Sequence, residues 1–141
     1  MKNLISKIYY INLDKRVDRK KFMENQLSEF DIPYERFPAV YVERNELLYK
    51  DGKYHDYYLR CSPRDALNFK SAIETGVRFP NVRGLIGGCI SATTLYEKLL
   101  DESYDSNVLI LEDDCVLKNG WYEILEEFFD EYTDFVENWD M

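Results

Sequence analysis

The sequence has few of the residues on which metal-chelating and disulfide-bonded proteins depend. Its 141 residues include one histidine, His55, so metal sites built on paired histidines are excluded. The three cysteines, Cys61, Cys89 and Cys115, are an odd number, lie far apart and form no CxxC spacing. This pattern is typical of reduced, small apolar side chains, and it predicts neither a disulfide framework nor a zinc site.

Positive charge is also scarce. Lys and Arg total 18 against 27 Asp and Glu, which gives a formal net charge of −9 and opposes long-range attraction to nucleic acid or to an anionic membrane surface. No apolar run approaches the roughly 20 residues of a membrane span, and no apolar targeting segment follows Met1–Asn3. We therefore expect a cytoplasmic protein with no membrane span and no nucleic-acid partner.

Apolar side chains, in contrast, are plentiful. Hydrophobic residues make up 45% of the chain and aromatic residues 16%, a composition that excludes disorder. A length of 141 residues corresponds to one domain by the usual size of domains. We expect a single α/β domain over residues 1–141.

The stretch Val108–Asp114 (VLILEDD) is the strongest local signal. Its apolar residues predict a strand buried on both faces, as in a sheet covered by helices on each side. The strand ends in Glu112, Asp113 and Asp114, and neighbouring carboxylates need water, hydrogen-bond donors or a cation to be tolerated. Ligands of open α/β sheets bind where strands end, so these acids are candidate functional residues. A solvated turn before Gly120 is the alternative interpretation.

The first third of the chain predicts a βαβ unit. Lys7–Leu13 is expected to be a strand and Tyr34–Phe37 a second, parallel strand. Between them we expect a helix that begins with Asp18 as its N-cap and ends near Phe30, before Pro33. The apolar face expected of this helix consists of Phe22, Leu27 and Phe30, with Met23 and Gln26 beside them.

The signal weakens over Ala39–Arg83, which we interpret as an insertion over the ligand crevice with a helix over Asp65–Thr75. Gly84–Gly88 then leads into a helix expected over Ser91–Leu100. The glycines permit close backbone approach, and a helix N-terminus behind them could hold an anion. Tight packing of the helix entry on the sheet is the commoner role of such glycines.

The last segment predicts an amphipathic helix over Trp121–Tyr132. The chain then approaches another strand at Phe135–Met141, and an exposed sheet edge there would favour self-association. The apolar face expected of this helix consists of Trp121, Ile124, Leu125, Phe128 and Phe129.

Three stretches in this order, Tyr9–Arg19, Gly87–Leu99 and Leu109–Asp114, resemble glycosyltransferase family 25, the lipooligosaccharide and procollagen galactosyltransferase-like family. Arg36–Val40 is a fourth, weaker match. The resemblance implies a GT-A-like (Rossmann-like) fold with a mainly parallel sheet flanked by helices. It covers only the N-terminal part of the family's catalytic domain, so we expect the fold to be truncated at the C-terminus.

The resemblance also implies a chemistry. Family members transfer a hexose from a UDP-sugar donor, often UDP-galactose or UDP-glucose, to a glycan or hydroxylysine-type protein acceptor, and clustered carboxylates would select Mn²⁺ or Mg²⁺. The residues implied to lie near the nucleotide are Asn12, Leu13, Arg16, Arg19 and Ser91. Those implied to hold the metal are Glu112, Asp113 and Asp114.

The resemblance assigns no catalytic residue. The family usually has histidine after the motif serine, where this chain has Ala92, and often an acid at Tyr41. The family's later strands, with acceptor-side residues, have no counterpart before Met141. We therefore expect nucleotide binding with weak or no transfer. The alternative is a catalytically incomplete module that binds a nucleotide or a partner chain. A phosphoacceptor receiver domain is disfavoured, because its acidic pair belongs on its first strand.

Overall fold

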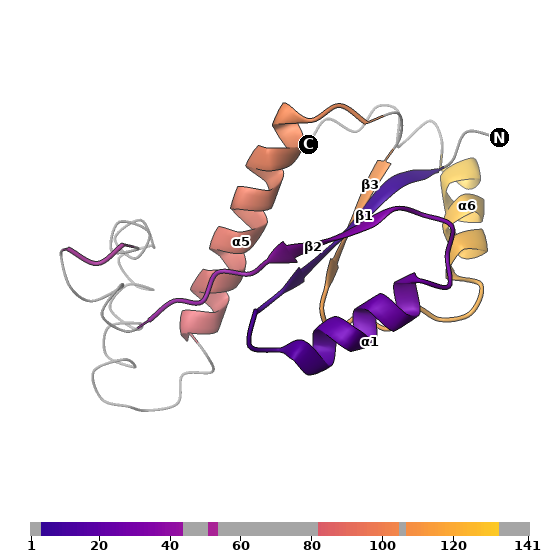
Figure 1. Cartoon of the computed structure of the whole chain (residues 1–141). Helices are drawn as coiled ribbons and strands as arrows, with labels where there is room; N and C mark the ends of the chain where they lie inside the picture. The colour runs from indigo at the N-terminus through magenta and orange to yellow at the C-terminus, as the bar shows by residue number, and fades with distance from the viewer. Residues whose placement is uncertain (1–3, 44–50, 54–81, 105–106, 133–141) are drawn as a thin grey trace. The chain divides into compact units, whose positions relative to one another are not determined.

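Figure 1 shows the computed structural model of the chain, which describes residues 4–43, 51–53, 82–104 and 107–132. The described elements follow one another as strand, helix, strand, helix, strand and helix. Their bounds are β1 (Ile5–Asn12), α1 (Val17–Leu27), β2 (Tyr34–Pro38), α5 (Val82–Asp101), β3 (Asn107–Glu112) and α6 (Trp121–Glu131).

The described strands form one parallel sheet in the order β2-β1-β3 (Figure 1), so the predicted α/β class with a parallel sheet is confirmed. The Ile8 N–H donates to the Pro33 carbonyl over 2.9 Å and the Ala39 N–H to the Asn12 carbonyl over 2.9 Å, which joins β2 to β1. Five of the eight residues of the central strand β1 are buried, as expected of a strand with neighbours on both edges.

One expectation about β3 was wrong. The run Val108–Leu111 predicted burial on both faces, yet only Leu111 is buried and Val108 to Ile110 are partly exposed. The reason is its place in the described sheet, where β3 lies at an edge and has a single neighbouring strand. An apolar run alone does not distinguish an edge strand from a central one.

The first of two compact units consists of Met1–Tyr10, Asp18–Glu35 and Tyr104–Met141. Its core joins β1 and β3 to both flanking helices of this unit. The buried members of this core are Ile5, Ile8, Tyr10, Met23, Leu27 and Leu111, and the side chains packed against them include Leu109, Trp121, Tyr122 and Leu125.

Helix α1 differs from its prediction in its ends and in its buried face. It begins at Val17, so Asp18 lies in its first turn rather than at the N-cap, and it ends at Leu27 rather than near Phe30. Met23 and Leu27, four residues apart, are its buried positions, whereas Phe22 is 43% exposed. Residues four apart share one side of a helix, and Phe22 precedes that stripe.

Helix α6 also buries less than predicted. Ile124 is 64% exposed and Phe128 45% exposed, and no residue of the helix is fully buried. At about 100° per residue, the predicted face from Ile124 to Phe129 spans about 140° of the helix, which is more than the core covers. The residues of α6 that pack against the core are Trp121, Tyr122 and Leu125, and Tyr122 lies outside the predicted face.

The second unit consists of Ile11–Val17 and Arg36–Ser103. Here α5 begins at Val82, so Gly84–Gly88 lies inside the helix and not before it, contrary to our prediction. A Cβ atom on Gly87 would lie 2.5 Å from the Val40 carbonyl oxygen, which explains a glycine within the helix. Gly87 therefore serves close packing, which is the commoner of the two roles considered for these glycines. The other role, an anion site at a helix entry behind Gly88, does not apply because α5 begins at Val82.

Several predictions fall outside the described residues. They concern His55 and Cys61, the helix over Asp65–Thr75 and the sheet edge at Phe135–Met141, together with most of the proposed insertion. The single-domain organisation stays a prediction. Among the helices that the structure describes, none combines the length and apolar character needed to cross a membrane.

The packing of α5 gives a test by paired substitutions. Gly87→Ala should lower the free energy of unfolding by about 1–3 kcal/mol, because the new methyl group meets backbone that cannot move aside. Gly88→Ala is the matched control, since its Cβ would meet nothing within 4 Å. Helix propensity should make this variant up to about 1 kcal/mol more stable. Urea unfolding measures both, and equal effects at the two glycines would contradict the packing.

Candidate functional site

The predicted acidic residues form a tight turn at the end of β3. The Cys115 N–H donates to the Glu112 carbonyl over 3.1 Å and closes the turn. Glu112 is exposed, Asp113 is buried at 8% exposure, and the side chain of Asp114 is 56% exposed. The three carboxylates therefore have different surroundings, and Asp113 needs a partner within the protein.

That partner is Arg19, which comes from the first turn of α1. Its Nη1 donates to Asp113 Oδ1 over 2.7 Å and lies 3.1 Å from Asp114 Oδ2. One guanidinium nitrogen thus contacts both carboxylates, and its charge offsets the repulsion between them. The residues lie 94 positions apart in sequence, and the structure brings together these members of the predicted metal and nucleotide sets.

Gln26 fixes the segment that follows the acidic turn. Its Nε2 donates to the Cys115 carbonyl over 3.2 Å, and its Oε1 accepts from the Leu117 N–H over 2.8 Å. Sequence reasoning gave Gln26 no functional role. The available signal was its spacing from Arg19, because seven residues are close to two helical turns and place both side chains on one face of α1.

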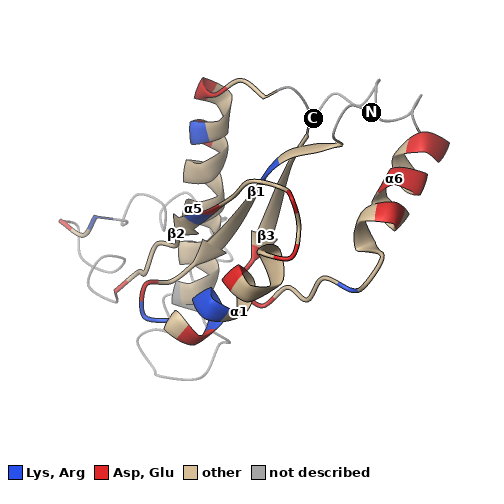
Figure 2. Cartoon of the chain, turned by 45° about the vertical axis from the view of Figure 1, so that its right-hand side comes forward, with Lys and Arg blue, Asp and Glu red and all other residues tan. Residues whose placement is uncertain are grey.

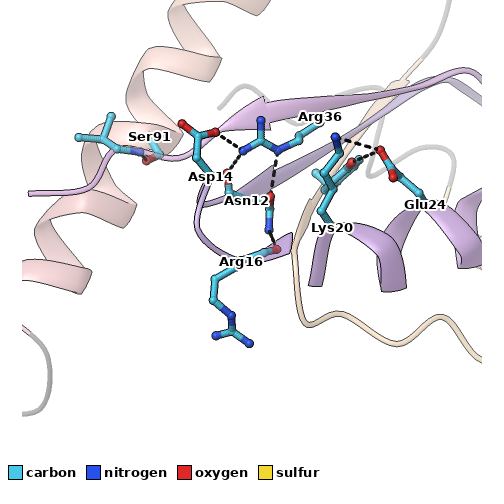
Figure 3. Close-up of polar contacts among 9 residues, drawn as sticks. Asn12, Asp14, Arg16, Lys20, Glu24, Arg36 and Ser91 are labelled. Atoms are coloured by element: carbon cyan, nitrogen blue, oxygen red, sulfur yellow. Dashed lines mark hydrogen bonds and ion pairs between the residues drawn. The ribbon is translucent and has the colours of Figure 1, made fainter. Parts of the chain in front are cut away.

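A second polar cluster, shown in Figure 3, holds the turn that follows β1. The Arg16 N–H donates to the Leu13 carbonyl over 2.9 Å, and Asn12 Nδ2 donates to the Arg16 carbonyl over 3.1 Å. Arg36 of β2 donates to Asn12 Oδ1 over 2.9 Å, to the Asn12 carbonyl over 3.0 Å, and to the Asp14 carboxylate. Arg36, which entered the sequence analysis only as part of a weak motif, is thus the organising cation of this turn.

The side chains of this turn differ in direction. Asn12 is buried and its amide is engaged on both sides by the chain itself. Figure 3 shows the Arg16 side chain directed away from the contacts around Arg36. Lys15 lies over the ring of Tyr41 at 3.6 Å from its centroid, a cation–π contact at the surface.

Ser91, predicted to lie near the nucleotide, is fully buried in α5. Its hydroxyl accepts from the Val40 N–H over 2.8 Å and donates to the Gly87 carbonyl over 2.6 Å. The oxygen therefore connects the helix to the segment after β2. Contact with a ligand would require this hydroxyl to share or give up one of these bonds.

Comparison with known proteins decides the family. The family described as glycosyltransferase family 25 (LPS biosynthesis protein) matches residues 5–140. The chain belongs to glycosyltransferase family 25. It is 32% identical over 110 residues to a "Glycosyltransferase 25 family member" of Aedes aegypti, covering 78% of this chain and 16% of that protein. It is 29% identical over 128 residues to the "Putative glycosyltransferase R655" of Acanthamoeba polyphaga mimivirus, covering 90% of this chain and 33% of that protein.

The carboxylates of Asp113 and Asp114 are the candidate ligands for a cation in this family 25 chain. Among the described residues, no group of three His, Cys, Asp or Glu side chains is arranged to hold a metal ion. Asp113 and Asp114, however, each direct one oxygen at the same guanidinium nitrogen. Magnesium is commonly bound through one or two carboxylates plus substrate phosphates. The donor set therefore fits a hard cation that a phosphate ligand completes, and it does not fit a cage built from protein alone.

The two hydrogen bonds that Gln26 makes to Cys115 and Leu117, here called the Gln26 clamp, can be tested by substitution. Gln26→Ala removes both bonds to the segment after the acidic turn and should cost about 1–2 kcal/mol of unfolding free energy. Hydrogen exchange of the Leu117 amide, followed by NMR, should accelerate by about tenfold or more relative to the wild type. Asn25→Ala, at the exposed neighbouring position, is the control and should leave this amide unchanged. An unchanged Leu117 exchange rate in Gln26→Ala would contradict the clamp.

Proposed function

We propose that this chain binds a UDP-hexose together with Mn²⁺ or Mg²⁺ and supplies the donor-binding part of hexosyl transfer to a glycan or hydroxylysine-type acceptor. The observation that carries the proposal is the convergence of Asp113 and Asp114 on one cationic atom, in a chain that belongs to glycosyltransferase family 25. The chain spans 16% and 33% of the length of the relatives compared above, so the activity of a whole family member is part of the proposal.

Charge supports a metal at the acidic turn. A UDP-sugar carries a diphosphate, and a chain with a net charge of −9 requires local cations to attract it. A divalent ion held by Asp113 and Asp114 would act as a Lewis acid that stabilises the diphosphate leaving group. The contribution of the protein is to hold the two carboxylates in a fixed turn, through the Cys115–Glu112 bond and through Gln26.

The turn after β1 carries Asn12, Leu13 and Arg16, which family resemblance assigns to the nucleotide. Asn12 is engaged within the chain, so its role is to fix the turn for its neighbours. Arg36 performs the same task from β2. Arg16 extends away from these contacts, as Figure 3 shows, and it is the side chain of this turn that we assign to a ligand phosphate.

A second candidate function is nucleotide binding without transfer. Transfer with inversion requires a base that removes a proton from the acceptor hydroxyl. The described residues contain no histidine, and Ala92 stands after the motif serine, where the family usually has one. This observation favours a module that binds the donor and depends on other residues for chemistry.

The binding proposal is tested by calorimetry with UDP. The affinity should fall by about tenfold or more when Mn²⁺ is replaced by EDTA, as expected when a metal bridges carboxylate and phosphate. Asp114→Asn should abolish this metal dependence. The control is Asp101→Asn, which removes the same charge from an exposed position at the end of α5. Equal UDP affinity in Mn²⁺ and in EDTA would refute the metal site.

Activity separates the two candidate functions. The purified chain is incubated with UDP-galactose or UDP-glucose, with and without Mn²⁺, and released UDP is measured. We expect little hydrolysis and little transfer, because the described residues contain no histidine to act as the base that transfer requires. Metal-dependent UDP binding without turnover is the expected pair of results. Robust metal-dependent transfer by the purified chain would show that its residues suffice for catalysis.

A further inference from the structure

The acidic turn already contains a cation, the guanidinium of Arg19. We propose that Arg19 competes with the divalent metal for Asp113 and Asp114 until a diphosphate ligand draws the guanidinium away. The metal and the nucleotide then bind cooperatively, each more tightly in the presence of the other. This inference rests on the proposed function, because it assigns a regulatory role to a side chain of the same site.

Arg19 occupies the position that a metal ion bound by these oxygens of Asp113 and Asp114 would take. Arg19 Nη1 lies 2.7 Å from Asp113 Oδ1 and 3.1 Å from Asp114 Oδ2, so it occupies the point on which both oxygens converge. A Mg²⁺ ion bound by the same oxygens would lie about 2.0–2.1 Å from each. The two positively charged groups cannot share that position. Binding of the metal therefore requires the guanidinium to move.

The ion pair of Arg19 and Asp113 is partly buried. The Asp113 side chain is 11% exposed and that of Arg19 is 35% exposed, so their contact is shielded from water more than an ordinary surface ion pair. Removal of one partner from such a pair leaves an uncompensated charge, which is unfavourable. A metal that binds alone must displace Arg19 from both carboxylates. The loss of these contacts lowers the apparent affinity of the chain for the metal.

A diphosphate changes this balance. The planar guanidinium binds phosphate oxygens in the same forked geometry that it uses with carboxylates, so a diphosphate offers Arg19 a new anionic partner. The metal can then bind Asp113 and Asp114 while the guanidinium of Arg19 contacts the diphosphate. Couplings between two binding sites are typically about 5- to 150-fold in affinity, which is the range expected here.

The turn itself does not depend on Arg19 alone. The Cys115 N–H bonds to the Glu112 carbonyl, and Gln26 bonds to the backbone on both sides of Val116. These bonds remain when Arg19 is replaced. The carboxylates therefore stay close to their positions, and a substitution at Arg19 tests the competition rather than the fold.

The experiment measures Mn²⁺ binding by the loss of the free-ion EPR signal, with and without UDP. Arg19→Gln should bind Mn²⁺ alone about tenfold more tightly than the wild type, because no internal cation competes. UDP should tighten Mn²⁺ binding to both proteins, because the metal bridges carboxylate and phosphate, and the tightening should be at least about threefold larger in the wild type than in Arg19→Gln. Arg19→Lys, which keeps the charge without the fork, should lie between them.

The matched control is Lys20→Gln, which removes one positive charge from the adjacent position of α1. Lys20 lies 3.7 Å from Glu24 and pairs along the helix, so its loss should leave both Mn²⁺ affinities close to wild type. Equal Mn²⁺ affinity in Arg19→Gln and the wild type would overturn the competition, and so would weaker binding in Arg19→Gln. If Arg19→Gln proves unstable, Arg19→Lys decides: tighter Mn²⁺ binding than in the wild type supports the competition, and equal or weaker binding overturns it.

The two proposals fail differently. The arm with Mn²⁺ alone contains no nucleotide, so tighter binding in Arg19→Gln would establish the competition even if UDP bound to none of the proteins. In that case the proposed donor site fails. Equal cooperativity between Mn²⁺ and UDP in the wild type and in Arg19→Gln would have the opposite meaning. The donor site would stand, and the role assigned to Arg19 would be rejected.

Discussion

The contact of one arginine with two neighbouring aspartates balances the charge of the acidic turn on which the proposed site depends. Asp113 and Asp114 follow an apolar strand, and adjacent carboxylates at such a position repel each other unless a cation lies between them. Arg19 supplies the cation from α1 and thereby connects the start of that helix to the end of β3. The same contact stabilises the turn, and in our proposal it is also the contact that a metal ion and a diphosphate would alter.

The turns after β1 and β3 are built in a similar way. In each, a polar side chain from a neighbouring element bonds to the turn, with Arg36 of β2 at the first and Gln26 of α1 at the second. Rigid elements that hold exposed loops are the usual support of binding sites. In Figure 2, Lys and Arg residues lie at the start of α1, and acidic residues lie along α6.

The sequence allowed the strands, the βαβ unit and the acidic turn to be predicted, because each depends on a local run of apolar or polar residues. It did not show that β3 lies at an edge, since burial depends on neighbours that no local pattern specifies. Gly84–Gly88 lies inside α5 and not before it, although glycine in a helix interior costs about 1 kcal/mol relative to alanine. The close approach of Gly87 to Val40 overrides that preference.

The residues of the candidate site were named from the sequence, and their role at a ligand stays a prediction, but their contacts within the chain were not predicted. Glu112, Asp113 and Asp114 are recognisable from three adjacent acids, and Arg19 from its family motif. The pairing of Arg19 with Asp113 spans 94 residues and follows from packing of α1 against the sheet, which periodicity cannot supply. Ser91 was predicted to lie near the nucleotide, and the sequence did not show that its hydroxyl bonds to the backbone of Val40 and Gly87.

The most direct measurement of the account is paramagnetic broadening in NMR spectra of the isotope-labelled chain with UDP and substoichiometric Mn²⁺. Signals of the turn Glu112–Cys115 and of the Arg19 side chain should broaden first and most strongly, because the ion would lie among them. Addition of EDTA should restore these signals. Strongest broadening at any other part of the chain, with the acidic turn unaffected, would contradict the placement of the metal and of the donor diphosphate.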